Sequence, residues 1–370
     1  MDMKMSNTPV KKSRFRVLRW LLMGGLTLVA SVGVFAYLIV DTFTAPFVDE
    51  VGKPVENSIA EERRMVIGGV EQYVLLRGRD RTAPLLVFVH GGPGASETPF
   101  LRRYNADLEN DFVVVYWDQR GAVHSYSPDL DPATFTIERM TEDLRELVDT
   151  LLVEFDQEKV LLVGHSWGTI PALEYTAQHP DKVATYISIS QTTNQQESDA
   201  EGFEWALSQA KKAGDEEAIA TLEALGRPPY TLQQFITQRQ HVGRYGGSFK
   251  DGSSDFKLAS QMIMTDEFSW LDLGAFVKGV RLSGNALWEE QKHYDAESRY
   301  TTLDAPIVMM FGRGDRVISP RLGLAYFEML DAPSKEFIWF ENSAHAPLFE
   351  EPEKFNDTVR QVARGVGLLR

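Results

Sequence analysis

Short apolar runs alternate with amphipathic stretches along most of the chain beyond residue 64. The runs are rich in Val, Ile, Leu and Phe and too short for helices, so they predict buried strands. Stretches such as 137–154 and 170–178 repeat apolar residues at helical spacing. The expected strands are 64–67 and 71–77, paired as a hairpin, followed by 84–89, 112–117, 160–163, 183–190, 306–311 and 336–340. This alternation predicts an α/β fold, in which helices cover both faces of a mostly parallel, doubly wound sheet.

The pattern changes after Gln191. Residues 192–300 are rich in Gln, Glu, Ala and Lys, are broken by Pro228-Pro229, and contain no comparable strand. They predict a helical cap that is inserted into the sheet domain. The core is therefore expected in two parts, 64–191 and 301–370.

The amino-terminal segment has the pattern of a membrane anchor. Residues 1–19 are basic, and residues 20–40 run for 21 positions without a charge, which is long enough to cross a bilayer as a helix. The basic flank precedes this single span, so residues 1–19 are expected in the cytoplasm and the body on the extracytoplasmic side of the cell membrane. A cleaved signal peptide is the alternative, although the run is longer than usual and lacks an Ala-x-Ala exit. Residues 41–63 are expected to form a linker.

Composition narrows the classes of function. The 370 residues carry a net charge of −15 although the first 40 are basic, so the body is acidic. Nucleic-acid binding needs a basic surface and is not expected. The chain has no cysteine, which excludes disulfides, thiolate metal sites and a cysteine nucleophile. The oligomeric state is left open.

A Gly-x-Ser-x-Gly sequence, Gly164 to Gly168, joins the apolar run 160–163 to the helical stretch 170–178. A strand, a tight turn and a helix in this order are typical of a nucleophile elbow, in which the glycines leave room for a sharp turn that presents the serine. Ser166 is therefore the predicted nucleophile. The five-residue pattern also occurs by chance, so its context and its partners carry the prediction.

A serine nucleophile needs a base, and the base needs an orienting acid. On this type of fold the two follow the serine in the order acid, then His, at the ends of later strands. The strand 306–311 leads into Asp315, and the strand 336–340 leads into His345. Alone, Asp315 could cap the next helix and a single His is more often structural. Their shared order and position predict a triad of Ser166, Asp315 and His345.

Acyl transfer also needs backbone N–H donors for the oxyanion of the tetrahedral intermediate. One donor is expected from Trp167, directly after the nucleophile. The other is expected from the loop that follows the strand 84–89, where glycines let the backbone approach closely. Within this loop Gly92 is preferred to Gly91.

These motifs resemble the proline iminopeptidase branch of the α/β-hydrolase family. The matching segments are His90-Gly-Gly-Pro-Gly94, Asp118-Gln-Arg-Gly121, Gly164-x-Ser-Trp-Gly168, Gly-x-Gly-Asp315, Ser343-Ala-His345 and Phe349-Glu-x-Pro352. The resemblance covers most of residues 64–190 and 304–360. It implies an α/β-hydrolase fold and a serine peptidase that removes an amino-terminal residue, often proline, from short peptides without a metal or a cofactor.

The resemblance also implies acidic cap residues that bind the α-amino group of the substrate, since a cation in a pocket needs an anionic partner. Thr265-Asp-Glu-Phe268 resembles a cap motif with one such glutamate, which makes Glu267 the first candidate. Glu289 and Glu204 are further candidates. Each of the three is equally expected on a solvated helix face.

Two departures from the branch concern specificity. Residues 122–125 replace the Gly and Arg that usually follow Gly121, and Arg316 stands where some members carry a second amine-binding Glu. A cation there would repel an ammonium group. An esterase, lactonase or amidase acting on a small apolar substrate therefore stays open, as does a catalytically silent binding ectodomain. Epoxide hydrolases and dehalogenases resemble this fold but use Asp in place of Ser166, so neither is expected.

Overall fold

The computed structural model describes residues 19–20, 23–25, 27–29, 31, 43–252 and 265–370. Its centre is a sheet of eight strands in the order β1-β2-β4-β3-β5-β6-β7-β8. β1 pairs with β2 and β2 with β4 in antiparallel fashion, and all other neighbours are parallel. The expected α/β fold is confirmed, with a sheet that is mixed but mostly parallel.

The strands are β1 (Ile59–Ile67), β2 (Val70–Gly78), β3 (Leu85–Val89), β4 (Val113–Trp117), β5 (Val160–His165), β6 (Val183–Ile189), β7 (Ile307–Gly312) and β8 (Lys335–Phe340). The helices around them are α2 (Thr98–Tyr104), α3 (Ile137–Glu154), α4 (Thr169–Gln178), α11 (Pro320–Met329), α12 (Pro347–Glu350) and α13 (Pro352–Gly365). Every residue of β3, β4, β5 and β7 is buried, which explains why their sequences are continuous apolar runs.

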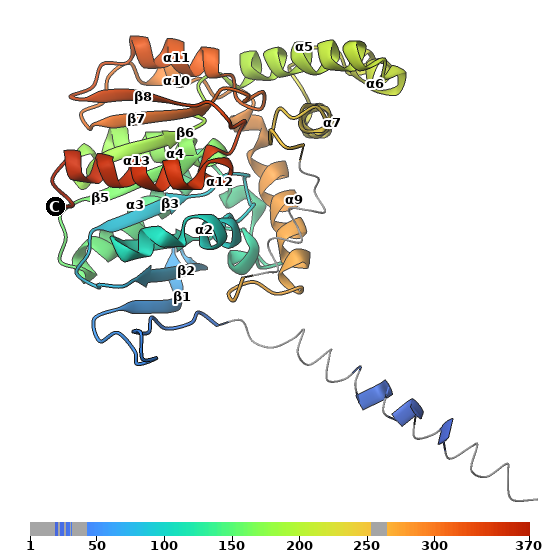
Figure 1. Ribbon diagram of the computed structural model, residues 1–370. Coiled ribbons are helices and arrows are strands. Elements are labelled where there is room, and N and C mark those ends of the chain that lie inside the picture. The colour runs from blue at the N-terminus through green and yellow to red at the C-terminus, as the bar shows by residue number, and fades with distance from the viewer. Residues whose placement is uncertain (1–18, 21–22, 26, 30, 32–42, 253–264) are drawn as a thin grey trace, which may run out of the picture.

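Helices cover both faces of the sheet (Figure 1). On one face α3, α4 and α11 pack against alternate strand residues such as Val87 and Leu162. On the other face α2, α12 and α13 pack against the intervening residues, such as Leu86 and Leu161. The two hydrophobic clusters fix the register of the strands, because a shift by one residue would exchange the faces.

The hairpin begins earlier than the sequence pattern predicted. β1 starts at Ile59, within the segment 41–63 that was expected to be a linker. The residues before it also contact the sheet domain. The Arg77 guanidinium lies 4.7 Å from the centre of the Phe47 ring, and Thr44 forms a hydrogen bond with the same side chain. Alternating exposed and part-buried residues give β1 a weak apolar signal, since it is the edge strand.

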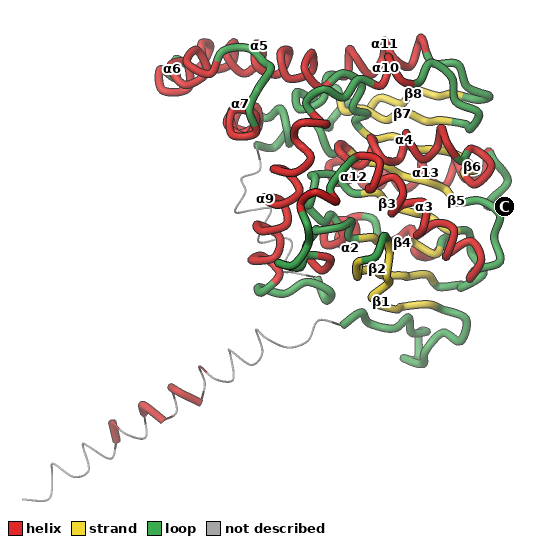
Figure 2. The backbone as a smooth tube through the Cα atoms, turned by 180° about the vertical axis from the view of Figure 1, so that it is seen from behind, coloured by secondary structure: helices red, strands yellow, loops and turns green. Residues whose placement is uncertain are grey.

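The helical insertion expected between the strands 183–190 and 306–311 is confirmed. It lies between β6 and β7 and contains α5 (Gln195–Ala213), α6 (Glu216–Leu225), α7 (Leu232–Arg244), α9 (Asp272–Gln291) and α10 (Ala296–Arg299). Figure 2 shows α5, α6, α7 and α9 together on one side of the sheet domain. We call residues 192–300 the cap.

Most of the predicted anchor, residues 20–40, lies outside the described residues. Within the residues that are described, no helix has both the length and the apolar character needed to cross a membrane.

Candidate active site

Ser166 lies in a sharp turn between β5 and α4. Its φ angle is +53°, in the left-handed region that side chains other than Gly rarely adopt. A short 3-10 turn, Ser166–Gly168, then leads directly into α4. The strained backbone pushes the serine out of the strand and towards the cap, as expected for a nucleophile elbow.

A side chain would not fit at Gly164 or Gly168, the glycines on either side of Ser166. A Cβ on Gly164 would lie 3.0 Å from Cβ of Ala172, and a Cβ on Gly168 would lie 2.6 Å from the carbonyl oxygen of His90. The turn therefore packs directly against α4 and against the loop after β3. This close backbone contact explains the Gly-x-Ser-x-Gly spacing.

The three predicted triad residues are brought together from separate strands. His345 Nε2 lies 2.9 Å from Ser166 Oγ, and His345 Nδ1 lies 2.9 Å from Asp315 Oδ2. Asp315 follows β7, and His345 follows β8. Because β5, β7 and β8 are parallel, the loops after them meet at the same edge of the sheet.

Asp315 is fully buried and hydrogen-bonded at both oxygens. Its Oδ1 accepts the N–H groups of Val317 and Ile318 at 2.8 and 2.9 Å, and its Oδ2 accepts the Ser190 hydroxyl at 2.7 Å. Burial raises the pKa of Asp315, but the charge and hydrogen bond of His345, followed by those from Ile318 and Ser190, outweigh it and hold the pKa below its ordinary value. The carboxylate is therefore ionised and holds Nδ1 of His345 as the proton-bearing nitrogen.

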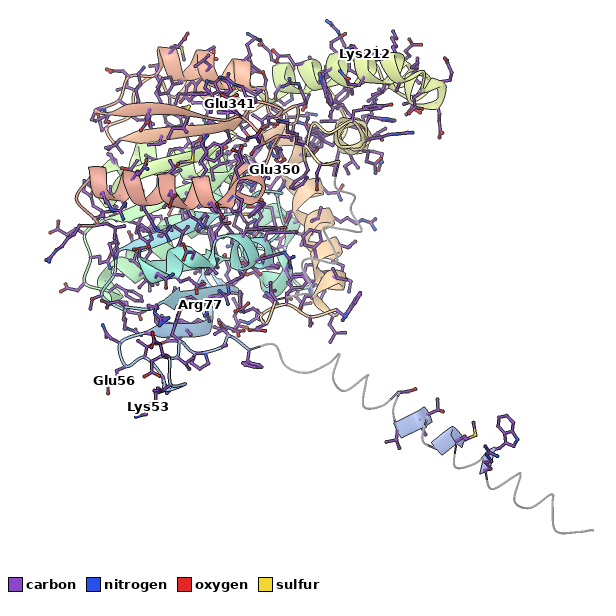
Figure 3. All side chains as sticks on the ribbon, in the orientation of Figure 1. Lys53, Glu56, Arg77, Lys212, Glu341 and Glu350 are labelled. Atoms are coloured by element: carbon purple, nitrogen blue, oxygen red, sulfur yellow. The ribbon has the colours of Figure 1, made fainter. Side chains whose placement is uncertain are left out.

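Two carboxylates hold the loop that carries His345: Glu350, the last residue of α12, and Glu351, which follows it. Glu350 accepts the N–H groups of Ala344 and Lys250, each at 2.8 Å. It lies between the sheet and the cap (Figure 3). Ser343 donates its hydroxyl to Glu351 at 2.7 Å. The Phe349-Glu-x-Pro352 segment of the sequence therefore fixes the position of the base.

The predicted oxyanion donors lie beside Ser166. Gly92 and Trp167 both line the same cavity as Ser166 and His345. Within the described residues, the Gly92 N–H makes no hydrogen bond, so it is available to an oxyanion. The loop is held by Gln119, which donates from its side chain to the carbonyl oxygen of His90 at 2.7 Å and from its backbone to His90 Nε2 at 3.0 Å.

The Asp118-Gln-Arg-Gly121 segment contacts the loop after β3 and, through His124, the cap. Asp118 is buried and accepts hydrogen bonds from the hydroxyls of Ser96 and Thr98. It also lies 3.0 Å from Nδ1 of His124, whose Nε2 lies 3.5 Å from Asp272 of α9. Burial lowers the pKa of His124, but hydrogen bonds with both carboxylates raise it to about 9. A protonated His124 thus links the core to the cap.

A cavity of about 340 Å³ opens above Ser166. The core contributes Gly92, Glu97, His165 and His345 to its wall, and the cap contributes Phe235, Arg239, Phe276 and Gln291. Most of the remaining lining is apolar. In the described part of the chain, no three His, Asp or Glu side chains gather as a metal site would require.

The three glutamates that were candidates for amine binding do not line this cavity. Glu267 is buried and accepts hydrogen bonds from Arg102 Nε at 3.0 Å and Thr44 Oγ1 at 2.9 Å. Glu289 is exposed beside Lys292, and Glu204 is exposed beside Arg227. The structure therefore gives none of them the expected place at the substrate.

Arg316 also lies outside this cavity. Its guanidinium donates to the carbonyl oxygen of Asp315 at 2.6 Å. Arg316 therefore does not contact the cavity above Ser166, where the repulsion of an ammonium group was expected.

Two site residues were not found from the sequence. Glu97 occupies the position before α2, but its side chain turns into the cavity instead of capping the helix. Its Oε1 lies 2.7 Å from Nδ1 of His165, and Nε2 of His165 lies 3.0 Å from the carbonyl oxygen of His345. The only signal in the sequence was position, since Glu97 follows the Gly-Gly-Pro-Gly loop and His165 directly precedes Ser166.

Both nitrogens of His165 face acceptors. A carbonyl oxygen can only accept, and an ionised carboxylate can only accept, so His165 donates from both nitrogens as an imidazolium. Burial lowers the pKa of His165, but the charge and hydrogen bond of Glu97, then the His345 carbonyl, outweigh it and raise the pKa. Burial likewise raises the pKa of Glu97, and the same pairing holds it below its ordinary value. The two form a buried ion pair.

Comparison with known proteins identifies a family match over most of the chain. The family described as alpha/beta hydrolase fold matches residues 84–352. A probable aminopeptidase, YbaC of Bacillus subtilis, is 33% identical over 315 residues, which are 84% of this chain and 98% of the relative. A proline iminopeptidase of Heyndrickxia coagulans is 25% identical over 284 residues, covering 73% of this chain and 87% of the relative.

Solved structures agree on the fold. The crystal structure of a proline iminopeptidase-related protein from Thermus thermophilus superposes with a TM-score of 0.61 at 22% identity. The match covers 83% of this chain and 98% of that one.

Proposed function

The chain belongs to the α/β-hydrolase family, and from that premise we propose that it is a serine hydrolase that removes the amino-terminal residue of short peptides. The observation that carries the proposal is the unbroken chain of hydrogen-bond distances from Ser166 through His345 to Asp315. The relationship to a probable aminopeptidase and to proline iminopeptidases supports the choice of peptide substrates.

The reaction proceeds in two halves. Ser166 Oγ attacks the carbonyl carbon of the amino-terminal residue while His345 Nε2 takes the serine proton. The N–H groups of Gly92 and Trp167 stabilise the resulting oxyanion. His345 then gives the proton to the departing amine, which leaves an acyl-enzyme on Ser166.

Water completes the cycle by the same route. His345 removes a proton from a water molecule, which attacks the acyl-enzyme and forms a second oxyanion at the same donors. This intermediate collapses, the bond to Ser166 Oγ breaks, and His345 returns the proton to the serine. Asp315 stays ionised throughout and stabilises the imidazolium that forms twice per turnover. The products are a free amino acid and the shortened peptide.

The test compares three substrates that release related chromophores. They are a prolyl arylamide, an alanyl arylamide and a short acyl ester. We expect arylamide turnover that disappears when the amino group is blocked, and no turnover of any substrate by Ser166→Ala. An arylamide that is cleaved equally with a blocked amino group would reject the aminopeptidase assignment.

A second function rests on the lining of the cavity. Among the described residues, five phenylalanines line it, namely Phe100, Phe235, Phe249, Phe276 and Phe349. A largely apolar cavity also suits a small ester, lactone or amide. Ester turnover without arylamide turnover would favour this alternative and keep the same mechanism.

We also propose that residues 20–40 anchor the enzyme in the cell membrane with its body on the extracytoplasmic side. The uncharged run of 21 residues behind a basic flank supports this. Fractionation of the full chain, with a chain that starts at residue 43 as control, tests it. Full-length protein that washes off membranes at alkaline pH would reject the anchor.

A further inference from the structure

We propose that Glu97, which belongs to the core and not to the cap, is the carboxylate that binds the α-ammonium group of the substrate. The inference rests on the proposed function, because only an enzyme that acts on free amino termini needs such a group. It also assigns the specificity for free amines to the loop after β3, which carries the oxyanion donor Gly92.

The first support is the set of charges in the cavity. Glu97 is the only carboxylate among the described residues that line it. The glutamates expected from the sequence, Glu267, Glu289 and Glu204, lie outside this lining. An ammonium group that leaves water needs an anionic partner, and within the described residues this cavity offers one.

The second support is the distance from the nucleophile. A Cβ placed on Gly91 would lie 3.0 Å from Glu97 Oε1 and 3.3 Å from Ser166 Cβ. The Glu97 carboxylate and the Ser166 side chain therefore both lie next to Gly91, and close to each other. In an amino-terminal residue the nitrogen is one bond beyond the α-carbon next to the carbonyl, so its partner must lie this close to the nucleophile.

The third support is the remaining capacity of the carboxylate. Glu97 Oε1 pairs with His165, and the Gly91 N–H also helps to lower the pKa of Glu97. A carboxylate accepts about four hydrogen bonds, so these two partners leave room for an ammonium group. The ion pair with His165 holds the side chain in one orientation, so little further ordering is needed when the ammonium group binds.

The cap contributes an arginine to the lining of the cavity. Arg239 of α7 lines it, and Arg239 Nη2 lies 2.7 Å from Asp199 Oδ1. The Nε atom of Arg239 is buried and has no partner among the described residues. An arginine has no acceptor for an ammonium group, so among the charged side chains on the described lining Glu97 is the one that can bind it.

The experiment separates amine binding from general damage to the site. Alanyl p-nitroanilide carries the ammonium group, and propionyl p-nitroanilide is the same molecule without it. p-Nitrophenyl propionate reports on the triad alone. We expect Glu97→Gln to lower kcat/KM for the alanyl anilide about 10- to 100-fold more than it lowers kcat/KM for the ester, with the additional loss mainly in KM.

A second readout does not depend on peptidase activity. Alaninamide should inhibit hydrolysis of p-nitrophenyl propionate by the wild type, and propionamide should not. The preference should disappear in Glu97→Gln. If the wild type cleaves no anilide, the proposed function fails, and selective inhibition by alaninamide still decides whether Glu97 binds the amine.

Three variants serve as controls. Glu328→Gln removes an exposed carboxylate on α11 and should change nothing. Glu97→Asp keeps the charge, serves if the Gln variant does not fold, and should give an intermediate KM. His165→Gln should lower turnover of the ester and the anilide by the same factor. Equal losses on both substrates in Glu97→Gln would overturn the inference and leave Glu97 as a positioning residue for His165.

Discussion

The two walls of the cavity differ in how completely their polar groups are satisfied. On the core wall, Ser166, His345, Asp315 and His165 form one continuous set of hydrogen bonds. On the cap wall, Arg239 Nε and Gln195 Oε1 are buried without a partner among the described residues.

This difference separates chemistry from selectivity. A fully paired set of buried groups has one arrangement, because any other would leave a polar atom unpaired at a cost of about 1–3 kcal/mol. The core wall is therefore ready for catalysis before the substrate arrives. The cap wall has donors and acceptors to spare, which a substrate can complete, so the cap wall distinguishes the side chains of substrates, while Glu97 on the core wall selects for the free amine.

The largest effect is expected on the core wall. Ser166→Ala should lower kcat by about 10⁶-fold, because nucleophile and base act as one unit. Thermal unfolding should be unchanged, since the alanine keeps the Cβ and loses only one oxygen of a part-buried side chain. Retained activity in this variant would show that Ser166 is not the nucleophile, and the assignment of the chemistry to the core wall would fail.

Asp315→Asn should give the next largest loss. The amide can donate to Nδ1 of His345 and so favour the wrong tautomer, which should lower kcat by about 10⁴-fold with little change in KM. Single-turnover measurements on an ester check this. A change confined to KM would mean that Asp315 supports binding and not the base.

A third change tests the link between the walls. His124 joins Asp118 of the core to Asp272 of the cap, and its raised pKa of about 9 exceeds the unfolded value near 6.5. Its contribution is fully present below pH 6.5 and is lost as pH rises through about 9. His124→Gln should therefore lower the free energy of unfolding by about 1.5–3 kcal/mol at pH 7.

The comparison of His124→Gln with the wild type should be repeated at about pH 10, above the raised pKa. Urea unfolding should then give nearly equal stabilities, because the wild-type histidine is neutral as well. A difference that is the same at both pH values would show that His124 acts through packing alone.

The smallest effect is expected on the cap wall. Phe235 lines the cavity and packs against Trp288 with ring centres 4.6 Å apart. Phe235→Ala should change KM by about tenfold or less, by different factors for different acyl groups, and leave kcat for a short ester nearly unchanged. A loss of kcat for every substrate would show that the cap wall also takes part in the chemistry.

The core wall could largely be predicted from the sequence, because its signals are local. The run 160–163, the turn at Ser166 and the helix after it are continuous in the chain, and α3 was expected at the bounds it has, Ile137–Glu154. Asp315 and His345 each follow their own apolar strand. For parallel strands, sequence order and a common sheet edge are enough to bring these loops together.

The partners of charged side chains could not be predicted in this way. Glu97 and His165 are 68 residues apart, and Ser190 meets Asp315 across 125 residues. Glu267 looked like a substrate ligand, but its carboxylate pairs with Arg102. Periodicity predicts which face of an element is buried, but it contains no information about which distant charge that face will meet.

The contacts of Thr44 have a consequence for the reach of the enzyme. Thr44 forms hydrogen bonds with Arg77 of β2, which Figure 3 shows low in the view near the edge strand β1, and with Glu267 of the cap. The folded body therefore starts about four residues after the proposed membrane span, and four residues extend at most about 15 Å. If residues 20–40 span the membrane as proposed, a tether this short keeps the active site close to the lipid surface, and peptides near that surface are the ones it reaches.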